Sequence, residues 1–164
     1  MEQVKHKLDA EIQFVIFTIS NTEYGIYINN VLEVVRADGI APLPKAPPFI
    51  KGVINLRGKV IPVMDLRERF NVINIINTRK TRIIIIRLEN KEVGLIVDSV
   101  INVESINKAK IEPPLPVFGG LKMEYINGIA KFNNRIVIIL NIEKILTSEE
   151  KILLQEDING EQAV

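Results

Sequence analysis

The chain has 164 residues, of which 47% are hydrophobic and 25% are charged, and its formal net charge is +1. This is the composition of a globular protein with enough apolar material for a core, and the absence of cysteine excludes disulfides and thiolate metal sites. The near balance of charge argues against nucleic acid as the main partner, because proteins that hold phosphates over an extended surface usually carry a larger positive excess.

Residues 1–11 predict a flexible tail, and they contain no apolar segment of signal-peptide length. No later run approaches the ~20 apolar residues that a bilayer span needs. We therefore expect a cytoplasmic protein.

Residues 12–79 predict a small β-barrel. Short runs rich in isoleucine and valine alternate with turn residues, first around Asn21 and then, after a proline-containing connection, around Arg57. Such runs are typical of strands, and about five of them make an SH3-like barrel. At the end of this unit, Asp65 is expected to cap a short helical turn over residues 66–69.

Residues 80–146 repeat this pattern. Gly25 aligns with Gly94, 69 positions later, and Gly52 aligns with Gly128, 76 positions later, with the apolar runs around each pair in register. The second copy carries the longer connection between its two blocks. An internal duplication explains both alignments.

The fold prediction is mainly β, with two similar five-stranded SH3-like β-barrels that divide between residues 79 and 80. The runs 83–86 and 136–140 are apolar at every position, so both faces of these strands should be covered. Thr147 and Glu150 fit a capping box, which predicts a short C-terminal helix over residues 147–158, followed by a frayed tail over residues 159–164.

Positions at which the two copies differ are candidates for function, because the matching positions show what packing requires. The second hairpin turn carries Arg57 in the first copy and Asn133 in the second, so an arginine is not needed to form it. A solvated side chain is the alternative for such a residue, since exposed ion pairs contribute only about 0–1 kcal/mol. Two further differences are Glu33 against Asn102 and Asp65 against Asn141.

No catalytic site is predicted. The one histidine, His6, lies in the tail, and the chain has neither a cysteine nucleophile nor a glycine-rich phosphate loop. We expect a binding protein without enzymatic activity, metal or cofactor. A nucleic-acid-binding double barrel is the alternative, although only 5% of residues are aromatic and could stack on bases. Its basic rim would comprise Arg57, Lys59, Arg67, Arg69, Arg79, Lys80 and Arg82.

The segment FIKGVINLRGKVIPVMDLR, Phe49–Arg67, resembles the chemotaxis coupling protein family, CheW. The similarity covers about residues 12–155 and includes the EYGI segment at 23–26 and the NIEKIL segment at 141–146. It implies two SH3-like barrels and a non-enzymatic adaptor. Such an adaptor couples the cytoplasmic hairpin tip of methyl-accepting chemoreceptors to the regulatory domain of the histidine kinase CheA. The resemblance also implies recruitment to membrane-associated receptor arrays and a chain that is monomeric when free.

The resemblance further implies a partner-binding surface. Val31, Glu33 and Arg57 correspond to positions implicated in partner binding, and Gly52 to one where substitution disrupts coupling. A packing requirement is the alternative for Gly52, because the second copy also has a glycine there. Which residues face the receptor and which face the kinase stays open. The predicted surface comprises Val31, Glu33, Gly52, Asn55, Leu56, Arg57 and Val60, with Leu56 and Val60 excluding water around the guanidinium.

Overall fold

The computed structural model describes residues 10–114 and 122–154. The predicted tail segments 1–9 and 159–164 and the predicted helix end 155–158 lie outside the described residues. The prediction of a mainly β fold is confirmed. In the first copy the strands are β1 (Glu11–Ile19), β2 (Thr22–Tyr27), β3 (Val31–Arg36), β4 (Ile50–Leu56) and β5 (Lys59–Asp65). In the second copy they are β6 (Arg82–Leu88), β7 (Lys91–Val97), β8 (Ser99–Asn107), β9 (Ile111–Glu112), β10 (Ile126–Phe132) and β11 (Arg135–Leu140).

Helical structure is short throughout the described chain. The capping box is confirmed, because the Glu150 backbone N–H donates to Thr147 Oγ1 and the Thr147 N–H donates to Glu150 Oε1, each over 3.0 Å. The C-terminal helix begins at residue 148 and includes residue 154. Asp65 caps its helical turn as predicted, accepting from the Arg67 N–H over 2.9 Å. The other helical turns are η1 (Ile28–Asn30), α2 (Leu66–Arg69), η2 (Lys108–Lys110), η3 (Met123–Tyr125) and η4 (Ile142–Lys144).

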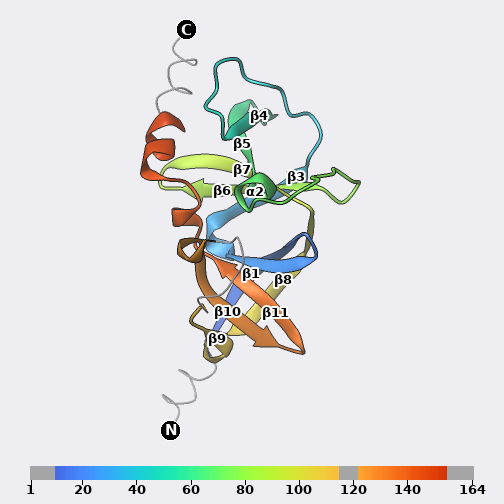
Figure 1. Cartoon of the computed structure of the whole chain (residues 1–164), viewed down its shortest axis with the longest axis vertical. Helices are drawn as coiled ribbons and strands as arrows, with labels where there is room; N and C mark the ends of the chain where they lie inside the picture. Colours follow the sequence, from blue (N-terminus) through green and yellow to red (C-terminus); the bar gives the residue numbers. More distant parts are fainter. Residues whose placement is uncertain (1–9, 115–121, 155–164) are drawn as a thin grey trace.

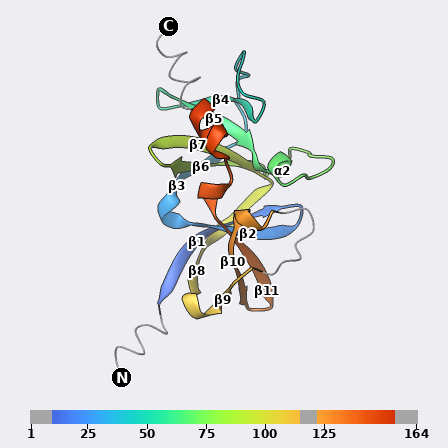
Figure 2. The ribbon, with the colours of Figure 1, turned by 60° about the vertical axis from the view of Figure 1, so that its left-hand side comes forward.

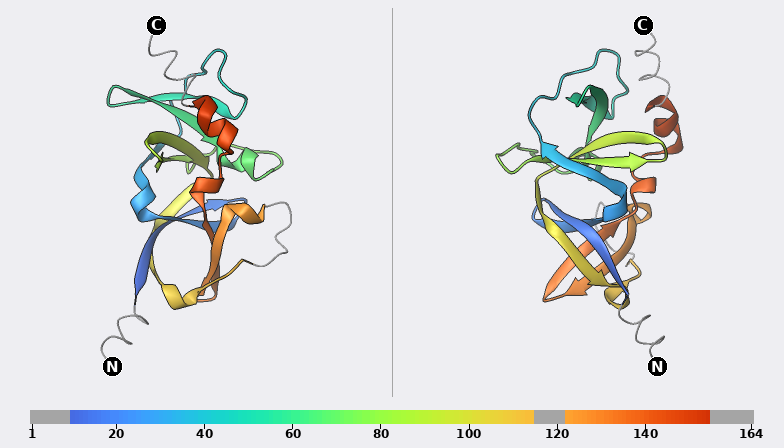
Figure 3. Two further views of the ribbon diagram at one scale, coloured as in Figure 1. Left: turned by 90° about the vertical axis from the view of Figure 1, so that its left-hand side faces the viewer. Right: turned by 180° about the vertical axis from the view of Figure 1, so that it is seen from behind.

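The strands form two curled sheets, stacked along the long axis of the molecule (Figure 1). The five-stranded sheet has the order β3-β6-β7-β5-β4, and the six-stranded sheet has the order β8-β1-β2-β11-β10-β9. The sixth strand is the two-residue β9, and an isolated bridge between Ala41 and Val53 takes its place in the other sheet. Figure 3 shows both sheets rolled into barrels, and Figure 2 shows the C-terminal helix beside the five-stranded barrel.

The two barrels do not divide between residues 79 and 80 as predicted, because the copies exchange hairpins. The hairpin β1–β2 of the first copy lies in the barrel with β8–β11, and the hairpin β6–β7 of the second copy lies with β3–β5. The exchange is reciprocal: Ile139 pairs with Gly25 in one parallel ladder, and Val63 pairs with Gly94 in the other. The two hairpins share one apolar pattern, so the pattern of either hairpin fits either barrel. The pattern alone therefore does not show which barrel each hairpin joins.

Three apolar clusters explain the runs that are apolar at every position. Ile83 and Ile85 point into the five-stranded barrel, whereas Ile84 and Ile86 point into the large cluster between the barrels. In β11, Val137 and Ile139 fill the six-stranded barrel, and its other core residues face the shared cluster. Both faces of these strands are therefore covered, as predicted, except at Ile136, which is 57% exposed near the β10–β11 turn. Each buried aliphatic side chain contributes about 1.5–3 kcal/mol.

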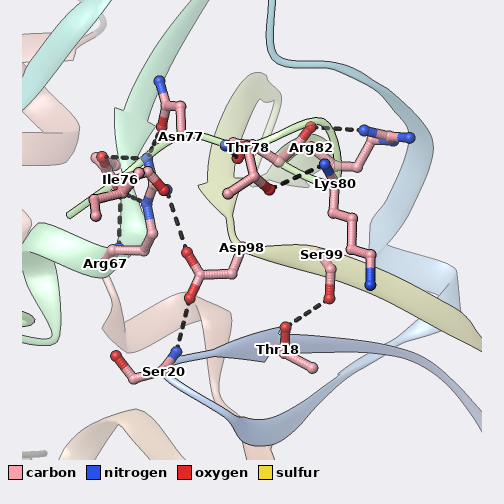
Figure 4. Close-up of polar contacts among 12 residues, drawn as sticks. Thr18, Ser20, Arg67, Ile76, Asn77, Thr78, Lys80, Arg82, Asp98 and Ser99 are labelled. Atoms are coloured by element: carbon pink, nitrogen blue, oxygen red, sulfur yellow. Dashed lines mark hydrogen bonds and ion pairs between the residues drawn. The ribbon is translucent and has the colours of Figure 1, made fainter.

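A buried arginine ties the barrels together at one side (Figure 4). Arg67 is 2% exposed and donates through its guanidinium to Asp65, to Asn77 Oδ1 at 2.6 Å and to Asp98 Oδ1 at 3.2 Å. The second oxygen of Asp98 accepts from the Ser20 N–H of the other barrel at 2.8 Å. Burial alone would lower the pKa of Arg67, but the hydrogen bonds and charges of the two aspartates outweigh it and raise the pKa. The guanidinium stays charged and fixes how the barrels sit relative to each other.

Candidate interaction surface

The turn between β4 and β5 is a two-residue hairpin turn. Leu56 pairs with Lys59, and between them Arg57 and Gly58 have φ of +53° and +83°. Asn55 Oδ1 accepts from the Gly58 N–H over 3.0 Å and supports the turn. Turns with both central φ values positive favour asparagine and glycine, so an arginine is held here against its backbone preference.

The second copy builds the same turn from ordinary residues. Asn133 and Asn134 have φ of +50° and +59°. Asparagine tolerates the left-handed region because its short polar side chain bonds locally. The sequence interpretation that the turn does not require Arg57 agrees with this geometry, and the side chain of Arg57 must act elsewhere.

Arg57 contacts Glu33, the other residue that distinguishes the first copy. Its Nη2 donates to Glu33 Oε2. Glu33 lies on β3, and the turn follows β4, so the contact joins the two edges of the five-stranded sheet that curling brings together. The side chain of Arg57 is 72% exposed and that of Glu33 is 29% exposed. As an exposed ion pair, this contact contributes only about 0–1 kcal/mol to stability.

A neighbouring ion pair serves as an internal comparison. Lys59 Nζ lies 3.4 Å from Glu92 Oε1, and at the equivalent positions of the other barrel Arg135 pairs with Glu23. This pair is present in both barrels and therefore belongs to the shared architecture. The pair Glu33–Arg57 has two asparagines at the equivalent positions and occurs in the first copy alone.

The Glu33–Arg57 pair lies at the rim of a hollow of about 330 Å³ between β3 and the β4–β5 hairpin. Leu32 of β3, which is 40% exposed, is an apolar residue of its lining. Apolar surface around an arginine is typical of protein–protein interfaces, which are enriched in this residue. The hollow is lined by Leu32, Glu33, Leu56, Arg57, Lys59, Ile61, Ile85 and Glu92, and we call these residues the rim surface.

Three of the predicted site residues, Glu33, Leu56 and Arg57, meet at the rim surface. Asn55 supports the turn. Val60 is exposed and lines an adjoining hollow, which shares Lys59, Ile61 and Glu92 with the rim surface.

Val31 and Gly52 lie apart from this surface. Val31 packs against the cluster between the barrels, because a β-bulge between it and Glu33 turns the two side chains to different faces. Gly52 is buried, and a Cβ there would lie 2.4 Å from the backbone oxygen of Ala41. The packing alternative for Gly52 therefore has a direct physical basis, which is the close approach of two backbones.

Sequence reasoning missed the lining residues Leu32, Ile61, Ile85 and Glu92, and it placed Lys59 only in the basic rim of the alternative function. The comparison of the two copies could not find the Lys59–Glu92 pair as a functional difference, because the equivalent pair Arg135–Glu23 is present in the other barrel. Four residues of the predicted basic rim are held in ion pairs or buried. Arg57 and Lys59 pair with glutamates, Arg67 is buried, and Arg69 donates to Glu150 over 2.6 Å and 3.0 Å.

Within residues 10–114 and 122–154, no group of histidine, aspartate and glutamate side chains could hold a metal ion. In the same part of the chain, none of the helices is long and apolar enough to cross a membrane.

Comparison with known proteins identifies the family. A family model described as the CheW-like domain matches residues 13–150. The chain belongs to the CheW-like domain family. The chemotaxis protein CheW of Klebsiella aerogenes is 37% identical to it over 142 residues, covering 87% of this chain and 86% of that protein. The chemotaxis protein CheW of Bacillus subtilis is 36% identical over 147 residues, covering 87% and 94%.

A solved CheW structure has the same fold. The crystal structure of the scaffolding protein TtCheW from Thermoanaerobacter tengcongensis matches with a TM-score of 0.77 and 37% identity, covering 86% of this chain and 91% of that chain. The resemblance to CheW that the sequence suggested is confirmed. The Glu33–Arg57 pair therefore lies on a CheW-like double barrel.

Proposed function

We propose that this CheW-like protein is a non-catalytic adaptor in chemotaxis signalling. It binds the regulatory domain of the histidine kinase CheA and the cytoplasmic hairpin tip of chemoreceptors, and the receptors recruit it to membrane-associated arrays. Two kinds of finding support this function. The relatives are named chemotaxis proteins, and the similar crystal structure is described as a scaffolding protein.

The observation that carries the proposal for the site is the Glu33–Arg57 pair. Two positions that differ between the copies contact each other, at a turn where arginine is unfavourable, beside the exposed apolar side chain of Leu32. Such an arrangement does little for stability while water covers it. When a partner covers the guanidinium and supplies an acceptor, one charged hydrogen bond contributes about 1.5–3 kcal/mol.

The adaptor acts by holding its two partners close together. Holding the kinase and the receptor on one molecule makes their encounter intramolecular, and the effective concentration replaces the bulk concentration. A standard interface takes about 800 Å² from each partner, and the accessible surface of this chain is 10196 Å². Two separate partners therefore fit on one chain at the same time.

Calorimetric titration of the protein with the CheA regulatory domain tests the proposal. We expect saturable one-to-one binding of micromolar or tighter affinity, with a weak dependence on salt. Two folded proteins that give no heat at two temperatures would contradict it. A nucleic-acid-binding function would appear instead as affinity for a DNA or RNA duplex that falls steeply with salt.

A further inference from the structure

The six-stranded barrel has an open, partly apolar end that shares no lining residue with the rim surface. It encloses a hollow of about 520 Å³, with Ile12, Phe14 and Ile139 among its apolar lining and Tyr27 and Glu143 among its polar lining. The rings of Phe14 and Tyr27 meet edge to face with centroids 6.4 Å apart. A concave apolar site with a few polar groups is the usual form of a binding site.

The equivalent end of the five-stranded barrel is closed. The duplication places Ile96 at the position of Tyr27, and these residues are 5% and 41% exposed. It places Arg67 at the position of Glu143, and their side chains are 2% and 54% exposed. The same fold position is therefore buried in one barrel and open in the other.

A segment of the chain itself closes the end of the five-stranded barrel. The connection from α2 to β6 crosses it, and the Arg67 guanidinium donates to Ile76 O at 3.3 Å and to Asn77 Oδ1 at 2.6 Å. Thr81, at the end of this connection, is buried. In the second copy the described chain leads from η4 into the C-terminal helix, and Leu154 of that helix packs into the cluster between the barrels.

We propose that the open end of the six-stranded barrel docks an extended segment of a partner protein. The segment presents an aliphatic side chain to the apolar lining formed with Phe14 and Ile139, followed by an amide or cationic side chain. The duplication gives the reason for this chemistry. Where the closed end has a guanidinium that donates to the covering segment, the open end has the Glu143 carboxylate, which can only accept.

The negative charge of Glu143 favours a partner side chain that donates hydrogen bonds. Lys151 Nζ lies 3.7 Å from Glu143 Oε2 and also 3.7 Å from Glu89 Oε1, so it is shared between two carboxylates. The Glu143 carboxylate is more than half exposed and can therefore accept from a partner. This site lies on the other barrel from the Glu33–Arg57 pair, and its test is independent of the function proposed above.

A peptide with the sequence of residues 71–82, NVINIINTRKTR, is the probe, because it is the segment that covers the closed end. It is titrated into the ¹⁵N-labelled full-length protein, and the amide resonances are followed. We expect saturable shifts at Tyr27, Asn127 and Glu143. The variant Glu143→Lys should weaken binding about fivefold, the upper end of the effect of losing one exposed ion pair.

The variant Glu89→Lys is the matched control. It makes the same change in charge and removes the other carboxylate near Lys151, but it lies on the β6–β7 turn of the other barrel. Its affinity for the peptide should stay within about twofold of wild type. Equal weakening by both variants, shifts confined to another surface, or no saturable shift at millimolar peptide would each overturn the proposal.

Discussion

The substitution Arg57→Asn gives the first copy the turn residue of the second. Its effect on folding should be small. The exposed ion pair with Glu33 contributes about 0–1 kcal/mol, and a left-handed backbone costs an ordinary residue about 1–2 kcal/mol, most of which asparagine avoids. Since Arg57 has φ of +53°, we expect the free energy of unfolding to stay unchanged or to rise by up to about 1 kcal/mol.

The effect of Arg57→Asn on binding should be large. Loss of a guanidinium that a partner covers removes about 1.5–3 kcal/mol, which corresponds to about 10- to 150-fold in the dissociation constant. Urea unfolding measures the stability, and calorimetric titration with the CheA regulatory domain and with the receptor tip measures the two affinities. We expect at least one of these affinities to fall by this factor.

The reciprocal variant Asn133→Arg is the control for Arg57→Asn. It places arginine in the turn of the second copy, where no glutamate occupies the position equivalent to Glu33. It should cost about 1 kcal/mol of stability and leave both affinities within about twofold. The reasoning fails if Arg57→Asn lowers the free energy of unfolding by more than about 1.5 kcal/mol, or if both affinities stay within twofold of wild type.

Three further predictions concern packing and charge. Arg67→Met leaves buried carboxylate without its cation, so the free energy of unfolding in urea should fall by about 3–5 kcal/mol, and a loss below about 1 kcal/mol would contradict the buried junction. Gly52→Ala places a Cβ 2.4 Å from a backbone oxygen and should cost about 1–3 kcal/mol, while the protein that remains folded keeps its affinity for both partners. Burial alone would raise the pKa of Glu150, but the pair with Arg69 and the capping hydrogen bonds outweigh it and hold the pKa below its usual value of 4.5. The stability from this pair is therefore complete above that value and is lost as the pH falls through the lower folded-state pKa. Arg69→Met should reduce the loss of stability that acid titration measures as the pH falls. If the variant and the wild type lose the same stability over this pH range, the pair contributes nothing.

Local chemistry in the sequence determined much of the fold. The capping box at Thr147 and the cap at Asp65 depend on residues within one helical turn, and both occur as predicted. The apolar runs also predicted strands with two covered faces, and the three clusters confirm this for every position of the two runs except Ile136. These features were accessible because each depends on neighbouring residues or on a strand's own pattern.

Other features depend on which segments meet, and the sequence could not supply them. The exchange of hairpins is invisible to pattern reasoning because both hairpins carry the same pattern. Arg67 was grouped with a basic rim, since its burial requires Asp98, which is distant in the sequence and reaches it only because β7 pairs with β5. Glu33 and Arg57 were each identified as differences between the copies, but only the curling of the sheet brings them into contact.

The claim that one molecule holds both partners is tested most directly by a titration with and without competition. The receptor tip is titrated into the protein alone and into the protein saturated with the CheA regulatory domain. An adaptor with separate sites keeps its affinity for the tip, within about twofold, and forms a complex of all three components. If the affinity for the tip falls in proportion to the concentration of the kinase domain, the two partners share one site, and the adaptor function is contradicted.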